Sequence, residues 1–297
     1  MRWIVWIGFF TLCILSGTSW AVPEAMPDGL SPLEQQGIVF GAIRLIALLF
    51  AGRGARGAGD VRYARLAAAA VSFFGVPSVV AEYAQRSVPA ISRSALYAMV
   101  PVVVVLSVAA GGMGTAEERG ARQFMVPALT GLGGLLLLLP LGISGSPYGL
   151  LMLGLVCLAV ILVGVASVWL YRLLQGVSFA VVVAVAGLAN AVFLFYWSAV
   201  RGEMVWRWSG VTSVVSISSM VDVVEILLIL WLLREMWPVR FTARYLVIPL
   251  LTVLESFVLM RPELTVRMVF GTVLLAVGAG LLLFLKAGEE ETVLSLR

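Results

Sequence analysis

The sequence predicts an all-α integral membrane protein whose ten transmembrane helices form two inverted five-helix repeats. Composition, the spacing of apolar segments and an internal sequence match support this. Of the 297 residues, 61% are hydrophobic and 12% are charged, and the mean hydropathy is +1.06. Soluble domains are about half apolar and about one quarter charged. The composition therefore excludes a soluble globular protein.

Apolar segments long enough to cross a bilayer recur along the whole chain, since about 20 residues span the hydrocarbon core. Turn-forming prolines and glycines separate them, and the short connections leave no room for an inserted soluble domain. The expected spans are residues 3–22, 34–52, 64–85, 90–110, 122–141, 148–172, 177–200, 209–232, 243–260 and 265–286.

The first span could also be read as a signal peptide, because small residues precede Ala21. Cleavage there would leave nine spans and no counterpart for the sixth. We therefore expect the helix to be retained, with Ser19 and Trp20 at the outer mouth of a cavity.

Basic residues predict the orientation, because cytoplasmic loops retain an excess of Lys and Arg. With the N-terminus inside, 13 basic residues fall in inner segments and six in outer segments, and Arg44 remains within the second span. We expect both termini to lie on the cytoplasmic side of the membrane.

Segments of the two halves of the chain resemble each other at offsets of 145 to 149 positions. Residues 89–101 read PAISRSALYAMVP and residues 238–249 read PVRFTARYLVIP, and both end in Tyr-x-x-x-Pro. Glu118, Arg122 and Gly133 recur with the same spacing as Glu263, Arg267 and Gly278. The match predicts repeats over residues 1–145 and 146–297. Because five spans is an odd number, the second repeat must be inverted.

The chain resembles the EamA-type members of the drug/metabolite transporter superfamily over its whole length. The resemblance rests on SGTSW (Ser16 to Trp20), on AIRLIALLFAG around Arg44, on Pro101 and Pro249 within spans, and on MRPELTVRMVFGTVLLAVGAG. It implies that spans one to four and six to nine line a central cavity. It also implies the export of amino acids, related metabolites or drugs across the bacterial inner (cytoplasmic) membrane.

The eighth span, SGVTSVVSISSMVDVVEILLILW, is the most polar. On a helix, Ser218, Asp222 and Glu225 fall within an arc of about 60°. Two carboxylates one turn apart cannot both ionise cheaply in a low dielectric, so this pair could exchange protons and couple a gradient to transport. The alternative is a structural ion pair with Arg44 or another arginine.

Two further charges fall inside spans, where each costs at least about 2.5–3.5 kcal/mol. Arg44 could pair with a carboxylate or an anionic substrate group, or be buried against backbone carbonyls. Glu255 has Ser107 at the equivalent position of the first half, so its charge breaks the repeat symmetry. It could mark the site, or it could be a protonated carboxyl between helices.

The other candidates for a substrate or proton site are uncharged. Asn190 and Tyr196 in the seventh span could bind substrate, although aromatic residues at span ends often anchor the interface. Tyr97 belongs to the repeated Tyr-x-x-x-Pro motif. Glu82 and Arg86 are expected to form an interfacial ion pair. The glycine spacings in spans five and ten favour close helix packing and leave a homodimer open.

Several classes of chemistry have no support in the sequence. Histidine is absent, and Cys13 and Cys157 lie in apolar runs, so no metal site, cofactor site or catalytic triad is indicated. The isolated arginines do not suggest nucleic acid. We expect a secondary transporter rather than an enzyme, with a small-molecule substrate and the lipid bilayer as its partners. The alternative is a membrane scaffold or sensor subunit that does not transport.

Overall fold

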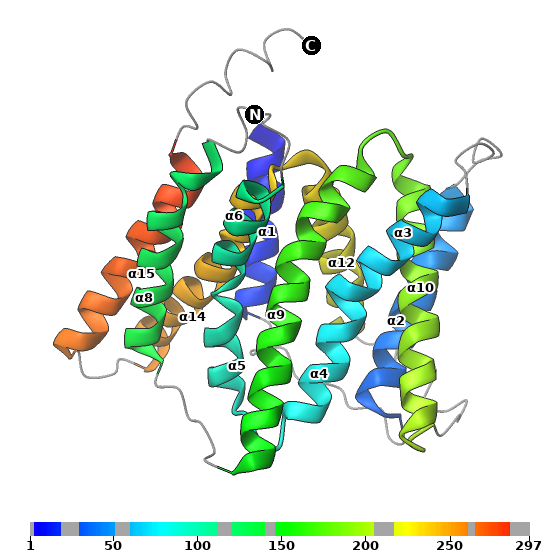
Figure 1. Ribbon diagram of the computed structural model, residues 1–297, viewed down its shortest axis with the longest axis horizontal. Helices are drawn as coiled ribbons and strands as arrows, with labels where there is room; N and C mark the ends of the chain where they lie inside the picture. The colour runs from blue at the N-terminus through cyan, green and yellow to red at the C-terminus, as the bar shows by residue number, and fades with distance from the viewer. Residues whose placement is uncertain are drawn as a thin grey trace, which may run out of the picture. The chain divides into compact units, whose positions relative to one another are not determined.

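The computed structural model describes residues 3–18, 30–50, 60–111, 120–139, 146–204, 217–260 and 265–285 (Figure 1). Within these ranges the chain is helical and contains no strand. Its contacts divide it into two compact units, and each takes segments from both halves of the sequence. The first unit comprises Met1–Tyr83 and Trp169–Glu235, and the second comprises Ala84–Val168 and Met236–Arg297.

The first unit is built from two long helices of the first half, a broken third helix, and two long helices of the second half. They are α1 (Trp3–Thr18), α2 (Pro32–Phe50), α3 (Asp60–Ala70) with the π-helix η2 (Val71–Gly75) and α4 (Val76–Ala84), α10 (Phe179–Val200) and α12 (Ile217–Glu235).

The second unit contains the remaining helices and most of α9, whose last turns belong to the first unit. They are α5 (Ala90–Tyr97), α6 (Val100–Ala109), α8 (Met125–Leu138), α9 (Pro147–Leu174), α13 (Pro238–Thr242), α14 (Arg244–Met260) and α15 (Val266–Phe284).

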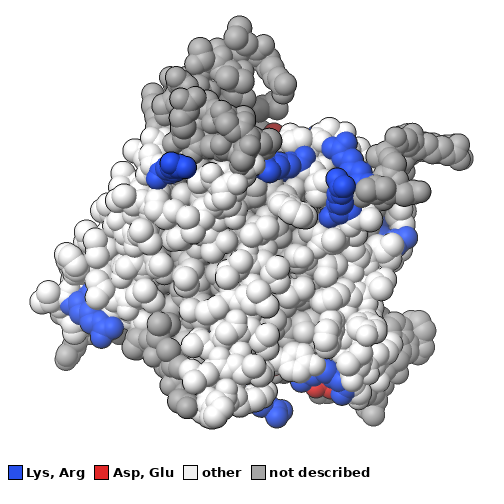
Figure 2. All heavy atoms as spheres, viewed as in Figure 1, with Lys and Arg blue, Asp and Glu red and all other residues white. Residues whose placement is uncertain are grey.

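The expectation of a multi-pass membrane protein is confirmed. In the described part of the chain, eight helices are long and apolar enough to cross a bilayer: Pro32–Leu49, Arg62–Ala84, Ala90–Ala109, Gly120–Leu138, Pro147–Leu174, Phe179–Val200, Pro238–Val258 and Val266–Phe284. On the face seen in Figure 2, basic side chains lie near helix ends and the helix surfaces between are uncharged.

The first and eighth expected spans are not among these eight. α1 is a shorter apolar helix of 16 residues, and α12 includes two acidic residues near its start and an Arg–Glu pair at its end. The rest of each expected span, within residues 19–29 and 205–216, lies outside the described residues.

Spans three and four, expected as single helices, are interrupted. In span three the Val76 amide donates to the Val71 carbonyl, five residues back, which forms the π-turn η2. Pro77 follows at once; it has no amide proton, and its ring would clash with the carbonyl four residues earlier, so a widened turn relieves the strain. Span four breaks into α5 and α6 at Ala98–Met99, just before Pro101.

Close helix pairs form the framework of each unit. In the first unit α2 packs against α10, and a Cβ at Gly187 would lie 2.8 Å from the Phe40 carbonyl oxygen. In the second unit α8 packs against α15, and a Cβ at Gly278 would overlap the backbone of Gly131. Both pairs lie side by side in Figure 1. The glycines of α8 and α15 therefore permit close packing, as the sequence predicts.

Candidate functional site

A cavity of about 230 Å³ lies within the first unit, between α2, the broken third helix and α12. Its walls combine two acidic, two uncharged polar and five apolar side chains. The lining residues are Gln36, Val39, Phe40, Phe74, Ser78, Asp222, Glu225, Ile226 and Ile229.

The acidic side of the cavity comes from α12. Asp222 and Glu225 both line it, which confirms that their spacing places them on one helix face. Asp222 is exposed and Glu225 is half-buried, so Asp222 lies nearer the rim. Ile226 and Ile229 continue the same stripe toward the C-terminal end of α12. The side chain of Ser218, expected on this face, lies outside the described residues.

The second wall is the broken third helix. Phe74 belongs to the π-turn, and Ser78 lies one turn later with its hydroxyl donating to the Phe74 carbonyl at 2.9 Å. The Phe74 ring meets the Phe40 ring of α2 edge to face, with centroids 5.6 Å apart. The irregular turn therefore positions one aromatic and one polar lining residue together.

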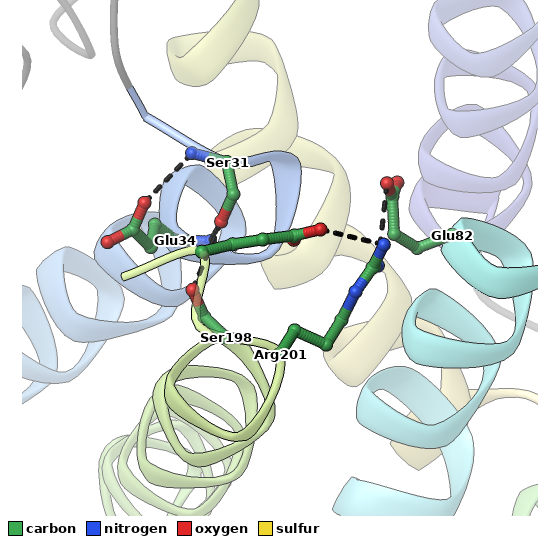
Figure 3. A network of polar contacts seen from close by, with 6 residues as sticks. Ser31, Glu34, Glu82, Ser198 and Arg201 are labelled. Carbon is green, nitrogen blue, oxygen red and sulfur yellow. Dashed lines mark hydrogen bonds and ion pairs between the residues drawn. The ribbon is translucent and has the colours of Figure 1, made fainter. Parts of the chain in front are cut away.

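The third wall is α2, whose start is fixed by a capping box (Figure 3). The Glu34 amide donates to the Ser31 hydroxyl at 3.3 Å, and the Ser31 amide donates to the Glu34 carboxylate at 2.8 Å. The hydroxyls of Ser31 and Ser198 on α10 are 3.1 Å apart. Glu34 is 1% exposed, and its carboxylate accepts a hydrogen bond from the Ser31 amide, which precedes α2.

Arg201, just beyond α10, joins the ends of α10 and α4 (Figure 3). Its guanidinium lies 3.6 Å from the Glu82 carboxylate and 2.8 Å from that of Glu203, and 4.7 Å above the Tyr83 ring. Trp197 packs against Tyr83 with centroids 6.3 Å apart. The expected partner of Glu82 was Arg86, four residues away. The cation seen beside Glu82 is Arg201, which follows α10 and is distant from Glu82 in the sequence.

Asn190 is fully buried on α10. Its side-chain nitrogen donates to the Ala186 carbonyl at 2.9 Å, and its side-chain oxygen faces Gly75 of the π-turn. A Cβ at Gly75 would lie 2.9 Å from that oxygen and 2.7 Å from Phe193. Asn190 therefore packs on η2, whose Phe74 lines the cavity, and is not itself a lining residue.

The other candidates of the first unit lie away from the cavity. Arg44 is half-buried on α2 and is not a lining residue, and its backbone packs on Gly187. Tyr196 is 62% exposed on α10, as an interface anchor would be. Ser19 and Trp20 lie outside the described residues.

Two candidates belong to the second unit. Tyr97 stacks on Tyr245, with centroids 6.1 Å apart and ring planes at 19°, so the two tyrosines of the repeated motif meet. Glu255 is half-buried on α14. Neither shares a unit with the Asp222–Glu225 cavity.

Sequence reasoning did not identify Gln36, Phe40, Phe74, Ser78 or Arg201. Gln36 belongs to the only Gln-Gln pair of the sequence, at the start of an expected span. This polar pair in an apolar segment could have marked Gln36 as a candidate site residue. The phenylalanines look like ordinary apolar residues. Among the described residues, no group of three or more His, Cys, Asp or Glu side chains is arranged to hold a metal ion.

Comparison with known proteins establishes the fold alone. No family model matches the chain, and no curated protein matches it. A solved structure described as "Crystal structure of protein" is similar, with a TM-score of 0.69 and 19% identity over 97% of this chain and 100% of that chain. At this identity the likeness extends to the helical architecture and not to a substrate.

Proposed function

We propose that the protein is a secondary active transporter of the bacterial inner membrane that exports a small molecule by alternating access. The observation that supports this best is the cavity of the first unit. It lies between two segments of membrane-crossing character, α2 and the broken third helix, and α12, which contributes the carboxylates of Asp222 and Glu225. Ionisable groups at such positions are costly and typically mark substrate or ion pathways.

The pairing of helices supports a ten-helix, inverted-repeat architecture. Span two packs on span seven (α2 with α10), and span five packs on span ten (α8 with α15). The stacked rings of Tyr97 and Tyr245 come from equivalent positions of the two halves. Contacts between equivalent elements are expected near a pseudo-twofold axis, the arrangement with which transporters build alternating access. The repeats would be residues 1–145 and 146–297, with both termini cytoplasmic.

The broken third helix contains a segment at which it could bend during a transport cycle. The π-turn Val71–Gly75, followed by Pro77, replaces regular helical hydrogen bonding directly at the cavity wall. Few-residue irregular segments of this kind absorb backbone changes in domain motions. A movement at η2 would displace Phe74 and Ser78 relative to the carboxylates of α12.

Proton coupling follows from the chemistry of two neighbouring acids. Two carboxylates one turn apart repel each other, and a proton or a cation bound between them would relieve that repulsion. Substrate and proton would then compete for the same carboxylates, and exchange of one for the other drives transport.

The proposal is tested first by comparing secreted and retained metabolites in cells with and without the gene. The compound that differs is then followed in liposomes containing the purified protein, with and without a pH gradient. We expect flux that responds to the gradient and is lost in Glu225→Gln. The control is Glu235→Gln, because Glu235 lies on the same helix, is exposed and pairs with Arg234 at 3.9 Å.

If cells with and without the gene secrete and retain the same metabolites, or if the compound that differs shows no flux in liposomes, transport is contradicted and the scaffold or sensor alternative is favoured. Flux that ignores the pH gradient and persists in Asp222→Asn would remove proton coupling while leaving transport in place.

A further inference from the structure

The C-terminal end of α10 holds Arg201 and Glu203 in a fixed relation to each other. The Glu203 amide donates to the Ser198 carbonyl at 3.2 Å, and the Gly202 amide donates to the Ala199 carbonyl at 3.0 Å. These two bonds form a Schellman motif, in which the residue after the helix adopts a left-handed conformation. Gly202 has a φ of 67°, which glycine adopts without a steric cost. The turn places the Glu203 carboxylate 2.8 Å from the Arg201 guanidinium.

The guanidinium of Arg201 holds its two carboxylates unequally. Its Nη2 lies 2.8 Å from the Glu203 carboxylate. Its Nη1 lies 3.6 Å from the Glu82 carboxylate of α4 (Figure 3). Nη1 is buried and has no hydrogen-bond partner among the described residues. The contact with Glu203 is therefore the tighter one, and the contact with α4 is a longer ion pair without a hydrogen bond.

Glu82 lies on the same face of α4 as a residue of the cavity wall. Ser78 lines the cavity, and Glu82 follows it by four residues within the same helix. Side chains four residues apart share a helix face. The contact between Glu82 and Arg201 therefore lies one helical turn beyond the cavity wall, at the end of α4.

The third helix is held at both ends and is irregular between them. Near its start, the Arg62 guanidinium donates to the Leu173 carbonyl at 3.4 Å, in the last turn of α9. Near its end, Glu82 meets Arg201. Between these contacts, the π-turn η2 interrupts the regular hydrogen bonding. Because short irregular segments absorb backbone changes, loss of the Glu82 contact would let α4 move while α3 stays in place.

We infer that Arg201 is the latch of a gate formed by α4, which opens and closes the cavity of the first unit. In the closed state Arg201 contacts both Glu82 and Glu203. When α4 moves away, Arg201 keeps Glu203, so its charge still has a carboxylate and opening costs less than the loss of a whole buried ion pair. The inference rests on the proposed function, because it names the movement that admits substrate to the transport cavity.

Access of a thiol reagent to the cavity tests the inference on the purified full chain in detergent. The reporter is Ser78→Cys, in a chain whose own cysteines are replaced by Cys13→Ala and Cys157→Ala. The reagent is hydroxyethyl methanethiosulfonate, which is small and uncharged, and intact mass spectrometry measures the rate of modification. Because Ser78 lines the cavity, more frequent opening of α4 raises this rate.

Variants of the latch should change the rate of modification. Glu82→Gln should raise it about threefold or more, because the amide keeps the shape of the side chain and loses its charge. Arg201→Gln should raise it to a similar extent and the double variant no further, since both substitutions remove the same contact. Glu203→Gln should lower the rate, because opening would then leave Arg201 without its second carboxylate. Glu235→Gln, at the end of α12, is the neutral control.

The outcomes separate the latch from the proposed function. Thermal unfolding first establishes that each variant is folded at the assay temperature. An unchanged rate in Glu82→Gln, additive effects of Glu82→Gln and Arg201→Gln, or a rate in Glu203→Gln raised as much as in Glu82→Gln would each overturn the latch, and transport would still be judged by flux. Rates that follow the latch in a protein without flux in liposomes would support the gate and contradict transport.

Discussion

The two units use their central helix pairs differently. In the second unit, the α8–α15 contact is made by glycines and apolar side chains: Gly134 and Gly278 each admit the backbone of the opposite helix. In the first unit, the α2–α10 pair has a close glycine contact at Gly187, and the unit also buries Glu34, Asn190 and Ser198. One pair is built for close contact alone, while the other adjoins a cavity with two carboxylates.

Both units bury polar side chains, since Ser92, Ser167, Thr242 and Arg244 are buried in the second unit. In the first unit the buried Glu34 is satisfied by a capping box, and Asn190 bonds to its own helix. Burial of a polar group without a partner costs about 1–3 kcal/mol. The hydrogen bonds of Glu34 and Asn190 avoid this cost. The comparison of the two helix pairs predicts that the α8–α15 contact is sensitive to added volume, and that the surroundings of the α2–α10 pair are sensitive to lost polar partners as well.

The largest effect is expected at the glycine contact of the second unit. Gly278→Leu would force a side chain into the backbone of Gly131, and overpacking of this kind typically costs about 1–3 kcal/mol and occasionally more. Because backbone cannot yield as a side chain does, we expect little folded protein, measured as the monodisperse fraction after extraction. Gly280→Leu is the control, since a Cβ there meets nothing within 4 Å. Equal losses in both variants would contradict the packing argument.

A smaller effect is expected at the helix contact of the first unit. Gly187→Ala would bring a Cβ to 2.8 Å from the Phe40 carbonyl oxygen and should destabilise the protein by about 1–3 kcal/mol. Thermal unfolding in detergent measures this. Gly41→Ala on α2 has open space and should be neutral or stabilising. A neutral Gly187→Ala would show that α2 and α10 can separate slightly.

Loss of a polar partner at the end of the first unit should have an intermediate effect. Arg201→Gln removes the cation beside Glu82 and over Tyr83, and we expect about 1–2 kcal/mol of destabilisation. The double variant with Glu82→Gln should be less destabilised than the sum of the single variants, because each single variant already loses the contact between the two side chains and the double variant loses it only once. Strict additivity would mean that the pair contributes nothing.

The smallest effect is expected at the start of α2. Ser31→Ala removes the acceptor of the Glu34 amide and should cost about 1 kcal/mol. Ser31→Thr preserves that acceptor and should retain most of the stability. Chemical denaturation of both variants measures the difference, and identical losses in the two variants would contradict the cap as the source of the stability.

The sequence by itself determined the membrane class and most of the helix positions. Hydrophobicity summed over about 20 neighbouring residues is a local property, so it is readable without a fold. It also placed Asp222 and Glu225 on one face, because helical periodicity is local as well. The Ser31–Glu34 capping box could also have been predicted, because a serine followed three residues later by a glutamate is the local sequence signature of this motif.

The tertiary structure alone decided which residues share the cavity and which ion pairs form. In the sequence Phe40 and Phe74 resemble any other apolar residues, and only the packing of their helices makes them line the same cavity as Glu225. Ser31 meets Ser198 across 167 positions, and Glu82 lies beside Arg201 rather than only near its sequence neighbours. The physical reason is that such contacts depend on how helices pack, which no periodicity along a single helix encodes.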